Sequence, residues 1–347
     1  MKLHHLLALA TTATAALTHK GVDWSSLLVE EAAGHTFTGL DGKKAPLETI
    51  LSANGITIVR QRLWANPPEK NYNLDYNLRL AKRARAANLN LYLDLHLSDT
   101  WADPSHQTPP AGWPSPSDID ALAWRTYNYT LAVSNAFAAA SIPVSLLSLG
   151  NEITAGALFP AGQLSTSNGP YNLARLLHSA AAGVKDSKLS PKPKLMLHLD
   201  DGWDLAKQEW WYDLLLKQGP LTKADFDVQG VSYYPFYNPK ATLGSLKSSL
   251  AGLKKKYGKE VMVVETNWPT SCPSPKYAFP SDAKSIPFSA AGQSTWLKSV
   301  AAAGGSGLFY WEPAWTDNAA LGSSCASNTM FEYGGKALSS LATFKEL

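Results

Sequence analysis

The feature that most constrains the fold is an alternation of strand-like apolar runs with helix-like patterns along the chain. The eight candidate strands are residues 21–27, 56–63, 89–97, 143–150, 194–199, 226–233, 260–266 and 307–311. Amphipathic stretches separate them, such as the one in which Leu74, Leu78 and Ala81 share one face. Eight strands that alternate with helices in 347 residues predict a single (β/α)8 TIM barrel.

A doubly wound open sheet is the alternative arrangement for this alternation. That fold usually carries a glycine-rich turn directly after its first strand. Here the first candidate strand runs into Asp23-Trp24-Ser25-Ser26, which contains no glycine. The sequence therefore favours the closed barrel.

Two candidate strands stop at a glutamate. The stretch 146–152 reads Leu-Leu-Ser-Leu-Gly-Asn-Glu, and 261–265 reads Val-Met-Val-Val-Glu. A carboxylate at the end of a buried strand is costly unless it is paired or used. Because active sites of this fold lie at the carboxyl ends of the strands, we expect Glu152 and Glu265 to meet across one cleft, about 5 Å apart.

The ends of the other candidate strands are also polar or aromatic. They carry Arg60, Arg62, Trp64, Asp94, His96, Asp99, Trp101, His198, Asp200, Asp201, Trp203, Tyr233, Tyr234, Trp311, Glu312 and Trp315, and Asn267 follows Glu265. Residues two apart in a strand share a face, so Arg60 and Arg62 point the same way. Buried arginines require carboxylate partners, which the strand-end glutamates could supply.

Simpler interpretations exist for several of these residues. Glu152 could serve only as an ion-pair partner of an arginine, and His96 could be an ordinary interior histidine. The pair Asp200-Asp201 could cap the helix that follows it. A metal site built from Asp94, His96 and His198 is possible, but their spacing matches no tight ligand motif.

Two facing carboxyl groups are the minimum equipment for hydrolysis of a glycosidic bond. One protonates the leaving oxygen, and the other attacks the anomeric carbon or activates water. Like charges at short range raise the pKa of one group and keep it protonated. The chain also has 12 tryptophans, many of them in loop-like contexts, where an indole ring can stack on the apolar face of a sugar.

The N-terminus has the pattern of a secretory signal. Lys2 precedes a short apolar stretch, and Ala13-Thr14-Ala15 offers small residues for cleavage. We expect residues 1–15 to be removed and residues 16–347 to form the catalytic domain, although an ordinary N-terminal helix is the alternative. Because no apolar run approaches the roughly 20 residues of a membrane span, we expect a secreted, extracellular, soluble protein without a membrane partner.

Export would favour a disulfide between Cys272 and Cys325, the two cysteines of the chain. Asn128 begins the sequon Asn-Tyr-Thr and is a candidate glycosylation site if it is exposed. The net charge of +3 is small and forms no basic stripe, which argues against a nucleic-acid partner.

Several of these stretches together resemble the endo-β-1,4-galactanases of glycoside hydrolase family 53. The matching segments are 21–23, 59–64, 94–104, 149–153, 230–235, 264–269 and 307–313. The resemblance implies retaining hydrolysis of β-1,4-galactan, a side chain of pectic arabinogalactan, with Glu152 as acid/base and Glu265 as nucleophile. It implies neither a cofactor nor a catalytic metal. Bacterial relatives carry calcium in the loop that here holds Cys272, so this chain is similar to the disulfide-containing fungal type.

The resemblance also implies roles for the remaining site residues. Asn151 would bind the sugar 2-hydroxyl, and Arg62 and Tyr234 would orient Glu265. The expected sugar contacts are His96, Asp99, Asn267, Trp101 and Trp311, the two tryptophans as stacking surfaces. Two alternatives remain open: a related glycosidase for mannan, xylan or glucan, and a non-catalytic sugar-binding barrel. We expect a monomer whose partner is the polysaccharide.

Overall fold

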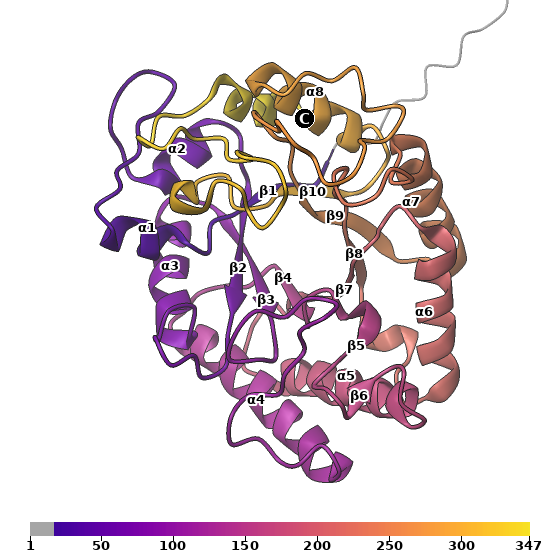
Figure 1. Cartoon of the computed structure of the whole chain (residues 1–347). Coiled ribbons are helices and arrows are strands. Elements are labelled where there is room, and N and C mark those ends of the chain that lie inside the picture. Colours follow the sequence, from indigo (N-terminus) through magenta and orange to yellow (C-terminus); the bar gives the residue numbers. More distant parts are fainter. Residues whose placement is uncertain (1–16) are drawn as a thin grey trace, which may run out of the picture.

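The computed structural model describes residues 17–347, so the expected signal at 1–15 lies outside the described residues. The described chain forms one closed barrel of eight parallel strands in the order β1-β10-β9-β8-β7-β4-β3-β2 (Figure 1). The strands are β1 (His19–Asp23), β2 (Ile58–Leu63), β3 (Asn90–Leu95), β4 (Leu146–Leu149), β7 (Lys194–Leu199), β8 (Val228–Ser232), β9 (Glu260–Thr266) and β10 (Gly307–Tyr310). The predicted TIM barrel is confirmed, and the open sheet is excluded because β1 pairs with both β2 and β10.

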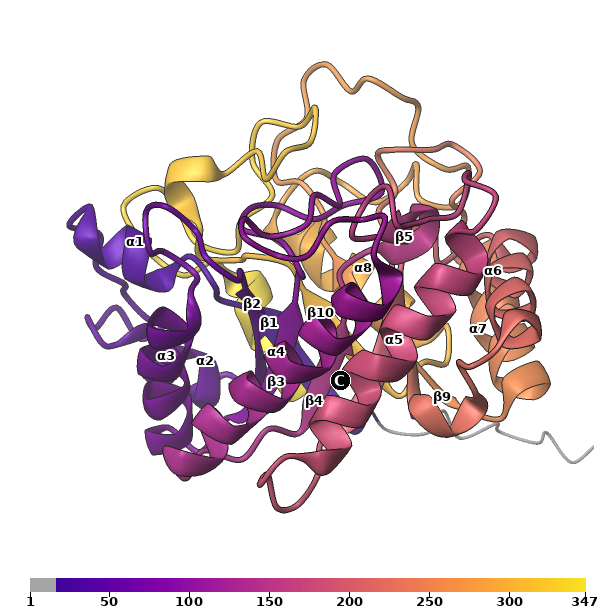
Figure 2. The same cartoon turned by 90° about the horizontal axis from the view of Figure 1, so that it is seen from below.

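Helices surround the barrel, and the loops that follow the strands gather at one end of it (Figures 1 and 2). The α-helices are α1 (Leu27–Ala32), α2 (Leu47–Ala53), α3 (Leu74–Ala86), α4 (Ile119–Ala139), α5 (Gly169–Asp186), α6 (Leu205–Gln218), α7 (Leu243–Tyr257) and α8 (Ala290–Ala301). Short 3-10 helices are η1 (Ile153–Ala155), η2 (Lys223–Asp225), η3 (Thr316–Asn318) and η4 (Ser339–Lys345), and β5 (Gly156–Ala157) pairs with β6 (Gly162–Gln163). No helix within residues 17–347 has the length and apolar character needed to cross a membrane.

Side-chain caps explain where five of the six longest helices begin, whereas α5 has no side-chain cap and carries Pro170 in its first turn. At each of these five helix starts, a side-chain oxygen of the capping residue accepts a hydrogen bond from a backbone N–H of the first turn. The capping residues are Asn73 for α3, Asp118 for α4, Asp204 for α6, Thr242 for α7 and Ser289 for α8. The cap of α6 is therefore Asp204, and the suggestion that Asp200-Asp201 caps this helix is wrong. At the other end of α7, Gly258 takes the left-handed conformation that lets the chain leave the helix.

The first strand is shorter than the predicted range 21–27. Asp23 accepts hydrogen bonds from the backbone N–H and the hydroxyl of Ser25. This local turn ends β1 and directs the chain into α1. The apolar residue Leu27, which extended the strand pattern, is instead a buried residue of that helix.

Each strand of the barrel changes from apolar to polar along its inward face. A lower layer packs Ile58, Tyr92, Leu146, Met196, Val228, Met262, Val264 and Phe309 together, all fully buried. Two residues further along the same strands lie Arg60, Asp94, Ser148 and His198, which are also buried. Because inward residues alternate along a strand, the apolar layer closes the barrel from below and the polar layer forms the floor of the site above it.

Packing in the lower layer requires a glycine in β1. A Cβ atom at Gly21 would lie 2.2 Å from the ring of Phe309. The missing side chain makes room for the phenyl ring, which also packs edge-on against Tyr92 at 5.3 Å between ring centroids. Small and large residues thus interlock across the closed barrel.

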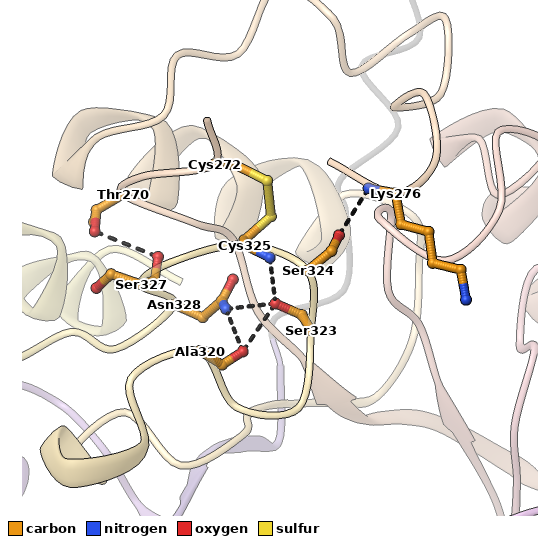
Figure 3. The surroundings of a disulfide bond; sticks show 9 residues. All are labelled: Thr270, Cys272, Lys276, Ala320, Ser323, Ser324, Cys325, Ser327 and Asn328. Carbon is orange, nitrogen blue, oxygen red and sulfur yellow. Dashed lines mark hydrogen bonds between the residues drawn. A yellow bond between two sulfur atoms is a disulfide. The ribbon is translucent and has the colours of Figure 1, made fainter. Parts of the chain in front are cut away.

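The predicted disulfide is present and joins two loops at the carboxyl end of the barrel. Cys272 lies in the loop after β9 and Cys325 in the loop after β10 (Figure 3). Nearby, the N–H of Thr270 donates to the carbonyl of Ser327 at 2.8 Å. Covalent and backbone contacts therefore hold these two loops together.

The glycosylation sequon lies on α4. Asn128 is exposed, whereas the Thr130 hydroxyl is buried and donates to the carbonyl of Ala180 at 2.9 Å. The acceptor side chain is therefore accessible on the folded surface. Whether it carries a glycan stays a prediction.

Replacing Phe309 by Ala should lower the free energy of unfolding by about 3–5 kcal/mol, because the barrel interior would be left with a cavity. Tyr333→Ala is the control, since that ring is 72% exposed. Urea unfolding followed by circular dichroism measures both variants. Equal stability of the two variants would contradict the packing described for the lower layer.

Candidate active site

A cavity of about 580 Å³ opens at the carboxyl ends of the strands. Eight of the predicted site residues line it: Arg62, His96, Trp101, Asn151, Glu152, Tyr234, Glu265 and Trp311. Among the other lining residues are Arg60, Asp103, Asp200, Asp201, Trp203, Ser232, Tyr237, Trp315, Asn318 and Leu321. The two glutamates, far apart in sequence, therefore share one cleft as predicted.

Glu152 reaches the cavity through an unusual backbone turn. Gly150 has φ 107° and Glu152 has φ 47°, a region that residues with a side chain rarely adopt. A Cβ atom at Gly150 would lie 2.6 Å from the side chain of Ile153. The Gly-Asn-Glu sequence thus allows the chain to turn sharply at the end of β4, which directs the carboxyl group of Glu152 into the cleft.

Glu265 reaches the cavity through an irregularity in β9. Met262 and Val264 face the barrel interior, so strict alternation would turn Glu265 outward. The register of β9 against β8 shifts between Val263 and Glu265, and such a shift re-aims the side chains that follow it. Glu265 therefore points inward, while Thr266 faces α8 and accepts a hydrogen bond from Trp296 at 2.9 Å.

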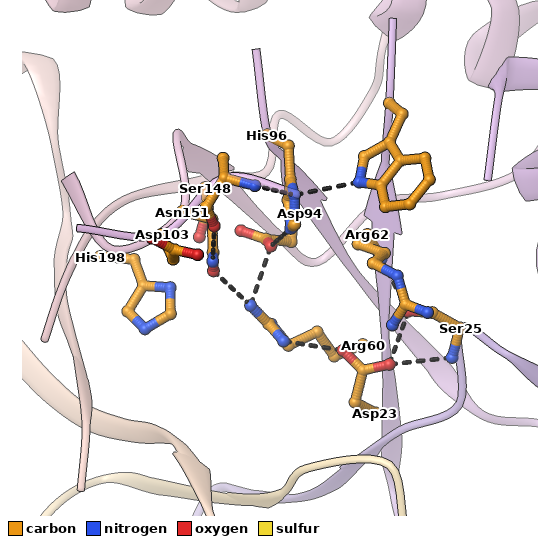
Figure 4. Close-up of polar contacts among 12 residues, drawn as sticks. Asp23, Ser25, Arg60, Arg62, Asp94, His96, Asp103, Ser148, Asn151 and His198 are labelled. Atoms are coloured by element: carbon orange, nitrogen blue, oxygen red, sulfur yellow. Dashed lines mark hydrogen bonds and ion pairs between the residues drawn. The ribbon is translucent and has the colours of Figure 1, made fainter. Parts of the chain in front are cut away.

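Arg60 connects the strand ends that build the site (Figure 4). Its guanidinium donates to Asp23 at 2.7 Å, to Asp94 at 2.8 Å and to Asn151 at 2.7 Å, and it lies 2.7 Å from a carboxylate oxygen of Glu265. Burial lowers the pKa of Arg60, but Asp94 and Glu265 outweigh that effect and hold the pKa well above its usual value. The arginine therefore stays charged and fixes groups from β1, β3, β9 and the loop after β4.

The expectation that Arg62 orients Glu265 is wrong. Arg62 lies two residues further along β2, nearer the mouth of the barrel, where its partner is Glu312. Arg60 takes the role assigned to Arg62. Both arginines point inward, as alternation predicts. The sequence alone did not show which of them would lie at the same height along the barrel axis as Glu265.

Asp99 and Asn267 are not among the residues that line the cavity. The carboxylate of Asp99 accepts the N–H groups of Asn66 and Ala111, each at 2.7 Å, and so joins two loops. Asn267 is 1% exposed and follows the last residue of β9. Neither residue therefore belongs to the cavity wall, and a role of either side chain in sugar binding stays a prediction.

His96 is both an interior histidine and a cavity residue. Its Nδ1 accepts hydrogen bonds from the indole of Trp64 at 3.0 Å and from the N–H of Ala102 at 3.1 Å. Its Nε2 lies 3.2 Å from Asp94 and must carry the proton. Burial lowers the pKa of His96, so the ring is neutral and held in one orientation.

Among the described residues, one cluster has the spacing of a metal site: Glu30, His35 and Asp317. Its carboxylates already have protein partners, since the N–H and hydroxyl of Thr316 donate to Glu30 and His35 lies 2.7 Å from Asp317. It lies outside the cavity lining. The set Asp94, His96 and His198 is not a cluster of this kind.

The environments of the two glutamates differ: Glu265 is buried, whereas Glu152 is half-buried. Burial and the neighbouring Glu265 raise the pKa of Glu152 well above its usual value. Burial also raises the pKa of Glu265, but Arg60 and the Tyr234 hydroxyl, which donates at 2.8 Å, oppose the rise. Glu152 therefore keeps its proton to higher pH than Glu265, and one acid faces one carboxylate.

Tyrosine and tryptophan side chains supply much of the remaining cavity wall. Trp101 lies 6.1 Å from Trp311 and 6.0 Å from Trp315 between ring centroids, and its ring is nearly parallel to that of Trp315. Tyr237 was missed because it lies in the loop after β8, beyond any strand pattern. Asp103, in the loop after β3, also lines the cavity but was not among the predicted contacts.

Comparison with known proteins identifies relatives over nearly the whole chain. A sequence model of glycosyl hydrolase family 53 matches residues 19–344. The arabinogalactan endo-β-1,4-galactanase of Humicola insolens is 59% identical over 337 residues, covering 96% of this chain and 100% of that protein. A solved structure of a fungal β-1,4-galactanase superposes with a TM-score of 0.93 at 59% identity, covering 96% and 100% of the two chains. The family 53 catalytic domain of Ignisphaera aggregans superposes with a TM-score of 0.80 at 26% identity, covering 94% and 95%.

Replacing Glu265 by Gln should lower the pKa of Glu152, because the amide removes a neighbouring negative charge that disfavours ionisation. Carboxyl chemical shifts followed by NMR across a pH series measure the change. Glu332→Gln, at an exposed position, is the control and should leave the titration of Glu152 in place. An unchanged pKa in the Glu265 variant would mean that the two carboxyl groups do not sense each other.

Proposed function

This chain belongs to glycosyl hydrolase family 53, and from that premise we propose that it cleaves internal β-1,4-galactosidic bonds in galactan and in type I arabinogalactan side chains of pectin. The similarity to galactanases over 96% of the chain supports this substrate. The observation that carries the chemistry is one cavity lined by two glutamates whose carboxyl groups have different surroundings.

The reaction begins with the protonated Glu152 and the ionised Glu265. Glu152 donates its proton to the oxygen of the leaving galactosyl chain while Glu265 attacks the anomeric carbon. The glycosidic bond breaks, and a covalent galactosyl ester forms on Glu265. Arg60 and Tyr234 hold the attacking carboxylate in place and favour its ionised form.

The second step uses the same pair in reversed roles. Once Glu265 is an ester it carries no charge, so the repulsion that raised the pKa of Glu152 disappears. Glu152, now deprotonated, accepts a proton from water, and the hydroxide oxygen attacks the anomeric carbon and releases Glu265. Two displacements at the same carbon give a product with the original anomeric configuration.

The surrounding polar groups are suited to bind and orient the sugar. Asn151 is fixed, since its amide oxygen accepts from Arg60 and its N–H donates to the carbonyl of Ala102 at 2.7 Å. We assign its second N–H to the 2-hydroxyl of the reacting galactose. His96 lines the same part of the cavity, and the tryptophan rings offer flat apolar surfaces for neighbouring sugar units.

The protein is proposed to act outside the cell as a monomer. The signal-like pattern of residues 1–15 and the disulfide between Cys272 and Cys325 support export. The exposed side chain of Asn128 is available for a glycan.

The enzyme should release reducing ends from potato β-1,4-galactan far faster than from mannan, xylan or carboxymethyl cellulose. Proton NMR of the first products should show the β-anomer before mutarotation.

Glu152→Gln and Glu265→Gln should each lower turnover by at least about 10³-fold while circular dichroism stays unchanged. Preference for another polysaccharide would contradict the proposed substrate. An α-anomer as first product would contradict the retaining mechanism, and wild-type activity of either variant would contradict the roles assigned to the two glutamates.

Removing the Tyr234 hydroxyl should shift the acid limb of the pH profile of kcat/KM to higher pH. The hydroxyl stabilises ionised Glu265, so Tyr234→Phe raises the pKa of that carboxyl. A higher pH is then needed before Glu265 is ionised and able to attack. A hydrogen bond to a charged group is worth about 1.5–3 kcal/mol, which predicts a rate loss of about 10- to 150-fold.

Tyr237→Phe is the matched control for this shift. Tyr237 also lines the cavity, but it makes no hydrogen bond with Glu265 within residues 17–347. Its acid limb should stay in place. A shift of equal size in both variants would show that the tyrosine at 234 has no special link to the nucleophile.

A further inference from the structure

Two buried charged residues beside the cavity take no part in the proposed reaction steps. Arg62 and Glu312 are ion-paired, and their side chains are 1% and 2% exposed. Ser26 completes the contact, since its hydroxyl donates to Glu312 at 2.9 Å and accepts from Arg62 at 2.8 Å. Taking two charges out of water is costly, so this arrangement calls for a reason other than stability.

Aromatic rings surround the guanidinium of Arg62. Its central carbon lies 4.1 Å from the ring centre of Tyr72, 4.4 Å from that of Trp101 and 5.2 Å from that of Trp315. These distances are within the range of cation–π attraction. A planar guanidinium can contact rings on its faces while its edge pairs with a carboxylate, which a lysine cannot do.

Glu312 ties the same group to the loop after β10. It lies in sequence between Trp311 and Trp315, which both line the cavity. Its φ of 47° turns the backbone between the two tryptophans. Glu312 itself does not line the cavity, so its side chain can affect sugar binding only indirectly, through Arg62 and the neighbouring tryptophans.

We propose that the Arg62–Glu312 pair is a positioning unit that holds Trp101, Trp311 and Trp315 in the arrangement that binds galactan. This inference rests on the proposed function. The pair acts on binding of the sugar chain and not on bond cleavage, because Glu265 has its own arginine, Arg60. It also explains why β2 carries two inward arginines: one serves the nucleophile and the other serves the aromatic wall.

The test is a split between KM and kcat on β-1,4-galactan. Arg62→Lys keeps the charge and loses the flat faces, and Glu312→Gln keeps the shape and loses the charge. Each should raise KM by about 5- to 30-fold, the range expected when a desolvated cation–π contact is lost, with kcat within about 3-fold of wild type. The double variant should be no worse than the poorer single variant, since both changes break one unit.

Arg83→Lys is the control, because Arg83 also pairs with two carboxylates, Glu31 and Glu48, but lies at the surface away from the cavity. Its KM should match wild type. If Arg62→Lys does not fold, the isosteric Glu312→Gln decides the question alone.

Three results would overturn the inference. KM could stay unchanged in Glu312→Gln, which would leave Arg62 as a direct sugar contact at most. In either single variant, kcat could fall by more than about 10-fold while KM stays constant. In the double variant, the increase in KM could equal the product of the two single increases. A wild-type enzyme that does not cleave galactan would contradict the proposed function instead.

Discussion

The site depends on one buried cation, Arg60. Three carboxylates and one amide converge on it from β1, β3, β9 and the loop after β4. Without the guanidinium, these acids would stand unpaired in the barrel, and unpaired buried charges are strongly destabilising. The same interaction therefore joins strand ends around the barrel and holds Glu265 and Asn151 side by side in the site.

The difference between the two glutamates follows from what surrounds each of them. Burial raises the pKa of both, but Arg60 and Tyr234 stabilise the ionised form of Glu265, while Glu265 and Asp200 disfavour ionisation of Glu152. Identical side chains thereby differ in how readily they lose a proton, which is the difference that the proposed reaction requires. The two arginines of β2 have different partners, since Arg60 contacts Glu265 whereas Arg62 contacts the rings of Trp101 and Trp315.

Much of this site was predictable because inward residues alternate along a strand. Alternation places Arg60 and Arg62 on the same face of β2, and both predicted glutamates line the cavity. The strand pattern is uninformative where alternation ends. Asp99 lies beyond β3 and binds loop N–H groups, Asn267 lies beyond β9, and the pairing of Arg62 depended on a stagger between strands that no single strand encodes.

The sequence alone determined the eight-fold strand and helix alternation, the polar strand ends, the two glutamates and the two cysteines that pair, because these are properties of residue type and spacing. Only the tertiary structure decided which arginine meets Glu265, that a register shift turns this glutamate inward, and that Arg62 pairs with Glu312. The reason is that closing the barrel sets the height of each strand relative to its neighbours. A contact between side chains on different strands depends on that height and not on their distance along the chain.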